Sequence, residues 1–145
     1  MSTVAQILRA KRGKAVHTIG PRSTVYEVVQ AMAEHGIGAL LVVEDQRIVG
    51  IVTERDYARK IVLAGRTSKE TPVADIMTRD VLFVSPQQTT EECMALMTEN
   101  RVRHLPVLDK GQLVGLVSIG DLVKDIISEQ RFIIEQLEHY ITGGR

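Results

Sequence analysis

The sequence predicts an α+β fold built from two copies of one β-α-β-β-α unit, with an extra helix at the C-terminal end. The chain has 145 residues, enough for one domain or two small ones. Residues 16–61 match residues 81–126 without a gap, 65 positions later, and thirteen of these forty-six positions are identical. Each copy also carries a capped amphipathic helix followed by two apolar runs typical of strands. An ungapped match of this length indicates a tandem duplication.

The first element of each copy is a short amphipathic segment, predicted to be helical at residues 4–8 and repeated at 73–77. A strand is predicted next, at 15–19 and at 80–84, before Pro21 and Pro86. Because residues 4–8 have a counterpart inside the chain, we expect the basic, acid-free residues 1–14 to belong to the fold and not to a targeting peptide.

A capping box then opens a longer helix in each copy. Thr24 is followed three positions later by Glu27, and Thr89 by Glu92. The helices show apolar stripes at helical spacing, namely Val25, Val28, Val29 and Met32 in one copy and Cys93, Met94 and Met97 in the other. Because Cys93 occupies the position of Val28, it is predicted to be a packed core thiol and not a nucleophile.

Two strands joined by a three-residue connector follow in each copy and predict a hairpin. The strands are expected at 39–43 and 47–52, and again at 104–108 and 112–117. The runs at 40–43 and 48–49 are apolar on both faces, which indicates that helices cover at least one side of the sheet.

The second strand of each hairpin ends in a repeated phrase, at residues 50–56 and 115–121. The phrase closes with Thr53 and Asp56 in one copy and with Ser118 and Asp121 in the other. It predicts a strand that runs into a helix, at 54–63 and 119–128. Two interpretations stay open: a capping box, or a helix start whose N–H groups favour an anion. Taken alone, the phrase favours the capping box.

The predicted domain organisation follows from the repeat. We expect a first domain at 1–65, a polar linker at 66–72 within the Gly- and Pro-containing stretch 64–72, a second domain at 73–128, and an amphipathic helix with a tail at 129–145. The apolar stripe of this last segment is predicted to face either the core or another subunit.

The composition and the apolar runs give little support to nucleic-acid binding or membrane insertion. Lys plus Arg equals Asp plus Glu, at 18 each, so no net charge attracts nucleic acid or a membrane. No apolar run approaches the roughly 20 residues of a membrane span. The single cysteine excludes an internal disulfide and fits a reducing, cytoplasmic location. The basic cluster Arg9, Lys11, Arg12 and Lys14 is interpreted as a solvated helix end, with contact to a ligand phosphate or nucleic acid as the alternative.

A duplicated unit of this order, ending in Gly-apolar-Val-Thr/Ser-x-x-Asp, resembles the CBS domain, and the whole chain resembles a tandem CBS pair, or Bateman module. Residues 103–107 and the spacing from Thr18 to Pro21 carry the resemblance further. It covers residues 4–127 and implies two sheets related by a pseudo-two-fold axis, with two ligand clefts between the halves.

In that family, the aspartate of the phrase accepts hydrogen bonds from ribose hydroxyls, a role that would fall to Asp56 and Asp121. The resemblance places adenine against apolar strand residues and phosphate beside the hydroxyl residue. The ligand-binding residues that it implies are Thr18, Ile37, Gly38, Ala39, Thr53, Arg55 and Asp56 in one cleft, and Phe83, Val102, Arg103, His104, Pro106, Ser118, Ile119 and Asp121 in the other.

The two copies differ in ways that bear on the ligand. Arg103 and His104 replace Gly38 and Ala39, and such cationic donors suit phosphate; a solvated strand edge is the alternative. Glu54 is expected to point away from the ligand, with Arg55 near it. We therefore expect the Asp121 cleft to bind a mononucleotide well, and the Asp56 cleft to bind a second copy or part of a longer ligand such as NAD.

The predicted function is regulatory and not enzymatic, because the sequence shows no defensible catalytic or metal-binding cluster. The resemblance implies binding of an adenine nucleotide, AMP first with NAD or ATP as rivals, and transmission of that signal to an unidentified partner protein by a change in conformation. A symmetric homodimer is also expected. The alternative is an interaction module with vestigial clefts, and nucleic-acid binding is a weaker third possibility.

Overall fold

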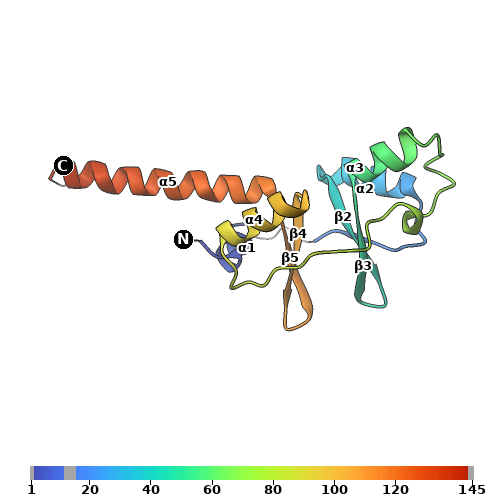
Figure 1. Ribbon diagram of the computed structural model, residues 1–145, viewed down its shortest axis with the longest axis horizontal. Coiled ribbons are helices and arrows are strands. Elements are labelled where there is room, and N and C mark those ends of the chain that lie inside the picture. The colour runs from blue at the N-terminus through green and yellow to red at the C-terminus, as the bar shows by residue number, and fades with distance from the viewer. Residues whose placement is uncertain (1, 12–15, 144–145) are drawn as a thin grey trace. The chain divides into compact units, whose positions relative to one another are not determined.

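The computed structural model describes residues 2–11 and 16–143. They form two compact units, one made of the described residues of Met1–Lys14 and Phe83–Arg145, the other of those of Ala15–Leu82. We call these the Asp121 unit and the Asp56 unit (Figure 1). Relative to the sequence repeats, the units exchange their opening segments. The first amphipathic segment packs with the second repeat, and residues 73–82 pack with the first.

The Asp56 unit contains a three-stranded sheet in the order β1-β2-β3, with β1 parallel to β2 and β2 antiparallel to β3. Its core includes the fully buried Val28, Leu40, Val52 and Ile76. In chain order its elements are β1 (Thr18–Ile19), α2 (Val25–His35), β2 (Ala39–Glu44), β3 (Arg47–Thr53), α3 (Glu54–Tyr57), the π-helix η1 (Ala58–Val62) and the 3-10 helix η2 (Val73–Asp75).

The Asp121 unit contains an antiparallel strand pair, β4 with β5, and its elements are α1 (Val4–Ala10), α4 (Thr90–Asn100), β4 (His104–Asp109), β5 (Gln112–Ser118) and α5 (Ile119–Ile141). The strand predicted at 80–84 is wrong, because only Val84 forms a bridge, with Val107. Pro106 explains the difference. It stands where Leu41 pairs with Thr18 in the first repeat, and proline has no N–H to donate to a third strand.

The capping boxes are confirmed at both long helices. Thr24 Oγ1 accepts from the Glu27 N–H at 3.2 Å, while Glu27 accepts from the Thr24 N–H at 3.2 Å. Thr89 and Glu92 repeat the exchange at 3.2 and 3.1 Å. Cys93 on α4 is fully buried, as predicted, and burial, followed by the charge of Glu92, raises the pKa of its thiol.

Helices α2 and α4 end in the same backbone conformation but at different residue types. Gly36 terminates α2 in the left-handed region, at φ 63°, and Arg101 does the same for α4 at φ 54°. Glycine adopts this conformation at little cost, whereas a residue with a Cβ is strained by about 1 kcal/mol. Arg101→Gly is therefore expected to raise the free energy of unfolding by about 0.5–1 kcal/mol in urea titrations. Gly36→Ala should lower it; a destabilising Arg101→Gly would contradict this account.

Each hairpin closes through two residues and not the three expected. Asp45 and Gln46 have φ of 50° and 65°, and Lys110 and Gly111 have 52° and 79°. Two successive positive φ angles indicate a type I′ turn, which matches the twist of paired strands. Glu44 and Asp109 therefore stay in their strands, paired with Arg47 and Gln112.

The repeated phrases lead into helices of different length. After Thr53, α3 continues through η1 to Val62, close to the predicted end. After Ser118, α5 runs for 23 residues without a break, so the helix predicted at 119–128 and the segment from 129 onward form one element (Figure 1). No glycine or proline lies between Asp121 and Ile141 to end it.

Candidate functional site

The repeated phrase forms a capping box in both units. In the Asp56 unit, Thr53 Oγ1 accepts from the Asp56 N–H at 3.2 Å, and Asp56 Oδ2 accepts from the Thr53 N–H at 3.0 Å. In the Asp121 unit, the corresponding distances between Ser118 and Asp121 are 3.2 and 2.9 Å. Each aspartate thus holds the end of a strand to the start of a helix, which confirms the capping interpretation of the phrase.

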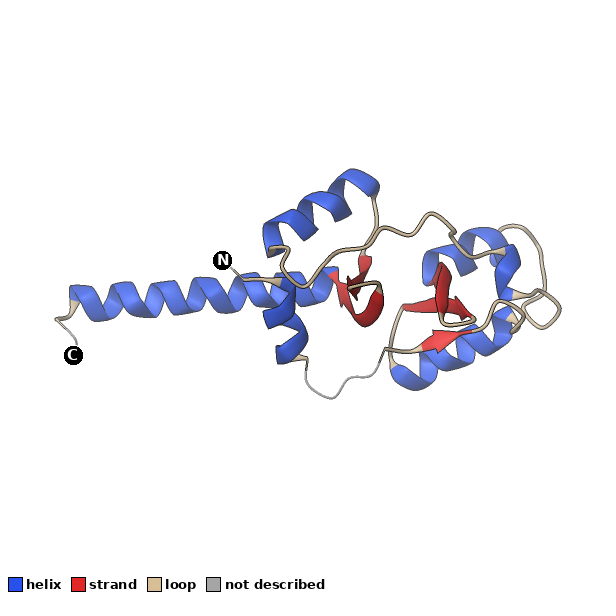
Figure 2. Ribbon diagram, turned by 90° about the horizontal axis from the view of Figure 1, so that it is seen from below, coloured by secondary structure: helices blue, strands red, loops and turns tan. Residues whose placement is uncertain are grey.

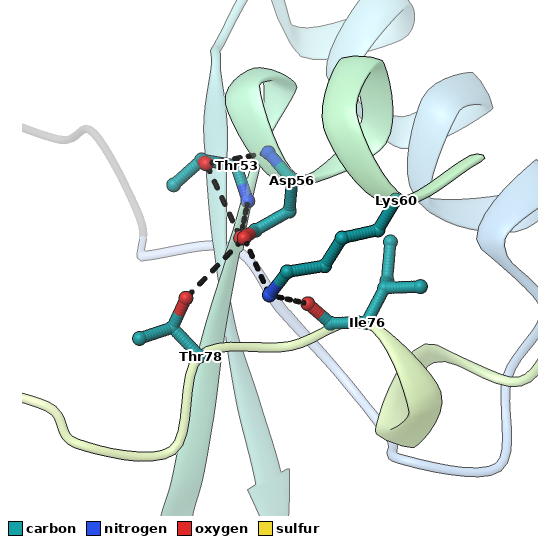
Figure 3. A network of polar contacts seen from close by, with 5 residues as sticks. All are labelled: Thr53, Asp56, Lys60, Ile76 and Thr78. Carbon is teal, nitrogen blue, oxygen red and sulfur yellow. Dashed lines mark hydrogen bonds and ion pairs between the residues drawn. The ribbon is translucent and has the colours of Figure 1, made fainter. Parts of the chain in front are cut away.

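The Asp56 carboxylate has further partners within its unit. Its Oδ1 atom accepts from Thr78 Oγ1 at 3.3 Å and pairs with Lys60 Nζ at 3.1 Å. The same ammonium donates to the Ile76 carbonyl at 2.8 Å (Figure 3). Both carboxylate oxygens are therefore engaged, and Asp56 is only 7% exposed.

The Asp121 carboxylate also has a lysine partner, from a different part of the chain. Lys11, which follows α1, donates from Nζ to Asp121 Oδ2 and to the Leu116 carbonyl, both at 2.8 Å. The Lys11 and Asp121 side chains are 27% and 21% exposed, so this pair is more open to solvent than Asp56 is.

Two opposing effects set the charge of Asp121. Burial raises the pKa of the Asp121 carboxyl. The hydrogen bonds from Lys11 and Ser118 lower this pKa, and together they outweigh burial, so the pKa lies below its ordinary value. The group is therefore an anion at neutral pH. It offers a charged acceptor to a hydroxyl beside an ammonium that suits an anionic group.

Other residues predicted for the Asp56 site lie around its capping box. Ala39 pairs with Thr53 across β2 and β3, and the Glu54 N–H donates to the Gly38 carbonyl at 3.1 Å. Glu54 differs from the expectation: its side chain is exposed, but its carboxylate lies over the Cα of Gly38 instead of pointing away. The chain thereby brings Ile37, Gly38, Ala39 and Thr53 together, with Arg55 exposed and Thr18 farther along the sheet beside Leu41.

The second set of predicted residues has a similar arrangement. His104 pairs with Ser118, and the Ile119 N–H donates to the Arg103 carbonyl at 2.9 Å. Val102 is half-buried, and Arg103 and Phe83 are exposed. Pro106 is buried in β4 opposite Leu116, unlike the other residues of this second set.

Comparison with known proteins identifies the family. The CBS domain profile matches the chain twice, at residues 4–63 and 73–128. The chain belongs to the CBS domain family. Its two copies form a tandem CBS pair, which agrees with the resemblance drawn from the repeat.

Individual relatives support the same conclusion. A solved structure of a putative signal-transduction protein with CBS domains from Burkholderia ambifaria is 60% identical, with a TM-score of 0.86 over 89% of this chain and 96% of that one. The mitochondrial CBS domain-containing protein CBSX3 of Arabidopsis thaliana is 47% identical over 126 residues, 83% of this chain; the match spans 61% of CBSX3. The hexameric CBS-CP12 protein from bloom-forming cyanobacteria is 29% identical, with a TM-score of 0.75 over 84% of this chain and 70% of that one.

Among residues 2–11 and 16–143, no three His, Cys, Asp or Glu side chains are grouped so that they could hold a metal ion. Within the same residues, every helix is too short or too polar to cross a membrane.

Three residues of the CBS pair that contact the aspartates were absent from the predicted site: Lys60, Thr78 and Lys11. The solvated-end interpretation of the basic cluster is wrong for Lys11, although Arg9 is exposed; Arg12 and Lys14 lie outside the described residues. The duplication could not have revealed these contacts. Lys60 has Asp125 as its counterpart, and Lys11 is 110 positions away from Asp121.

Lys11→Met is expected to raise the pKa of Asp121, because it removes the largest interaction that lowers it. The pKa of Asp121 in the folded chain lies below its value of about 3.9 in the unfolded chain. The stabilisation by the Lys11–Asp121 pair is therefore complete above about pH 3.9 and is lost as the pH falls through the pKa of the folded chain. We expect a loss of at most about 1 kcal/mol at pH 7 for this partly exposed pair. The carboxyl chemical shift of Asp121, followed from pH 7 to pH 2, measures this pKa. Arg9→Met is the control, and an unchanged Asp121 midpoint in Lys11→Met would contradict the assignment.

Proposed function

We propose that this CBS pair is a regulatory protein that binds an adenine nucleotide through its two phrase aspartates, with AMP as the first candidate and NAD or ATP as rivals. The observation that carries the proposal is the pairing of a carboxylate, a hydroxyl residue and a lysine ammonium at the start of a helix in each unit. The carboxylate suits ribose hydroxyls, while the ammonium and the helix start suit phosphate.

The two aspartates are not expected to bind equally. Asp56 already has partners on both oxygens, whereas the Lys11 and Ser118 contacts of Asp121 both fall on Oδ2. In addition, Ser118, which exchanges hydrogen bonds with Asp121, pairs with His104, the residue after Arg103. We therefore propose that the Asp121 unit holds the stronger mononucleotide site and that the Asp56 unit binds a second copy or part of a longer ligand.

Two measurements test the proposal. Small molecules released from the freshly purified protein are identified by mass spectrometry, and AMP, NAD and ATP are then titrated by calorimetry. A ligand at 100 times its dissociation constant should stabilise the fold by about 2.7 kcal/mol. We expect this stabilisation with AMP. Inosine monophosphate, which keeps the sugar and the phosphate but not the adenine base, is the control. If none of the three nucleotides shifts thermal unfolding, the proposal fails.

The Asp56 carboxylate is already bound by Thr53, Thr78 and Lys60 of its own unit. This favours a second candidate function, a protein-interaction module whose nucleotide sites are vestigial. This alternative predicts a partner protein and no nucleotide response.

The wider proposal is that the chain acts without catalysis, as a cytoplasmic homodimer that transmits ligand binding to another protein. Assembly of a CBS protein is supported by the hexameric relative, and the reducing location by the free, buried Cys93. Transmission requires that the ligand bind two conformations with different affinities. Light scattering at micromolar concentration tests the dimer separately from the nucleotide.

A further inference from the structure

The outer half of α5 presents an uncovered apolar surface. Near the start of the helix, Leu122 is fully buried and Asp125 accepts from Thr90 Oγ1 at 3.2 Å, so the first turns pack within the Asp121 unit. From Gln130 to Ile141 every residue is exposed. Figure 2 shows this part of α5 extending beyond the other helices of its unit.

Most of the exposed apolar residues of α5 lie along one continuous seam. They recur at alternating intervals of four and three residues, which is the heptad spacing of helices that pair side by side. The seam consists of Val123, Ile127, Gln130, Ile134, Leu137 and Ile141, of which only Gln130 is polar. The exposed fractions of Ile127, Ile134 and Leu137 are 46%, 53% and 55%. Ile133 and Tyr140 widen the seam on one side, at 50% and 86%.

We propose that this seam binds the same seam of a second copy, with the two α5 helices antiparallel. This inference rests on the homodimer part of the proposed function and specifies its contact. Antiparallel pairing centred between Gln130 and Ile134 sets Val123 opposite Ile141 of the partner subunit, and Ile127 opposite Leu137 of the partner subunit. Every seam residue then has a seam residue opposite it. The overlap of residues 123–141 is about 28 Å long at 1.5 Å per residue.

Charge selects the antiparallel direction over the parallel one. Lys124, Arg131 and Glu138 follow the seam along one edge, again seven residues apart. In the antiparallel pair this edge meets the same edge of the other helix, so Lys124 lies near Glu138 of the partner subunit, and the contact occurs twice. In a parallel pair the edge meets Ile126 and Ile133 instead, and neither charge gains an opposite charge. At the centre of the antiparallel pair, Arg131 lies near Arg131 of the partner subunit. The two ion pairs and the apolar layers outweigh the repulsion between these two arginines.

The seam is tested with Ile134→Glu, and Phe132→Glu is the matched control. Phe132 is 60% exposed on the same helix but lies about 160° around the axis from Ile134 at 100° per residue. Sedimentation equilibrium of the full chain should show a dimer whose dissociation constant rises at least a hundredfold in Ile134→Glu and less than threefold in Phe132→Glu. Circular dichroism and thermal unfolding confirm that both variants fold.

The direction is tested by charge exchange. Lys124→Glu and Glu138→Lys are each expected to weaken the dimer several-fold, and the double variant should return it to within twofold of the original. The two positions are 14 residues apart on one helix, about 21 Å at 1.5 Å per residue, so rescue can arise only between antiparallel copies. A double variant that is no better than the singles overturns the antiparallel arrangement.

The outcomes separate this inference from the proposal on which it rests. A dimer that persists unchanged in Ile134→Glu leaves the homodimer intact and overturns the α5 contact. A wild-type chain that is monomeric at micromolar concentration overturns both. Association with a different protein through the seam, with no self-association, likewise overturns the choice of a second copy as the partner.

Discussion

Gly50→Ala is expected to lower the free energy of unfolding by about 2–3 kcal/mol, the usual cost of forcing extra volume into a packed interior. Gly50 is buried in β3, and a Cβ built there would lie 2.8 Å from Met77 Sδ and 2.9 Å from the Thr78 carbonyl oxygen. That carbonyl accepts from the Ile51 N–H at 2.9 Å, and the Thr78 N–H donates to the Ile51 carbonyl at 2.8 Å. The backbone therefore cannot move aside without losing this bridge.

The duplication supplies a matched control in Gly115→Ala. A Cβ at Gly115 would approach only side-chain atoms of Leu8, the nearest at 2.5 Å. Because the end of a leucine side chain can rotate away, we expect a smaller loss, of about 1 kcal/mol. Chemical denaturation of the two variants gives the comparison. Equal losses at the two glycines would show that the backbone bridge at Thr78 is not what makes Gly50 necessary.

Gly50 also connects packing with the candidate site. Thr78 donates to Asp56 Oδ1 at 3.3 Å, and Lys60 connects the same carboxylate to Ile76. A residue that displaces Thr78 should therefore disturb the Asp56 carboxylate as well as the core. The segment at 76–78 holds the Asp56 network from outside the repeated phrase.

The duplication made most of the fold predictable, because each element could be identified twice. Capping boxes at Thr24 and Thr89 set the starts of the long helices, and the apolar runs set the hairpins. The strand at 80–84 could not be excluded by its own residues, since the obstacle is Pro106 on the neighbouring strand. Similarly, the length of α5 depends on the absence of a terminating residue after Ser128 and not on any repeated pattern.

The candidate site was predictable only in part, for a different reason. The repeat identifies residues that the two copies share, such as Asp56 and Asp121, but the two carboxylates are paired with lysines that have no counterpart in the other copy. Lys11 reaches Asp121 because the opening helix packs with the second repeat. Long-range packing of this kind leaves no periodic signal in the sequence.

Asp121→Asn is expected to lower the affinity for AMP by about a hundredfold, which corresponds to about 2.7 kcal/mol. The change keeps the size of the side chain and an oxygen for the Ser118 N–H but removes the charge that strengthens bonds to ribose hydroxyls. Asp56→Asn should lower the affinity of the Asp56 site less than tenfold, because Thr78 and Lys60 already occupy the Asp56 carboxylate. Calorimetric titration of the purified variants measures both effects.

Glu92→Gln is the matched control, because it separates loss of a capping charge from loss of a ligand contact. Glu92 caps α4 from the same third position and accepts from the Thr89 N–H at 3.1 Å, but it is exposed and outside the predicted site. Its affinity for AMP should stay within twofold of the original. If Asp121→Asn and Glu92→Gln bind AMP equally well while both remain folded, Asp121 serves only its helix, and the nucleotide, if it binds, is held by other residues.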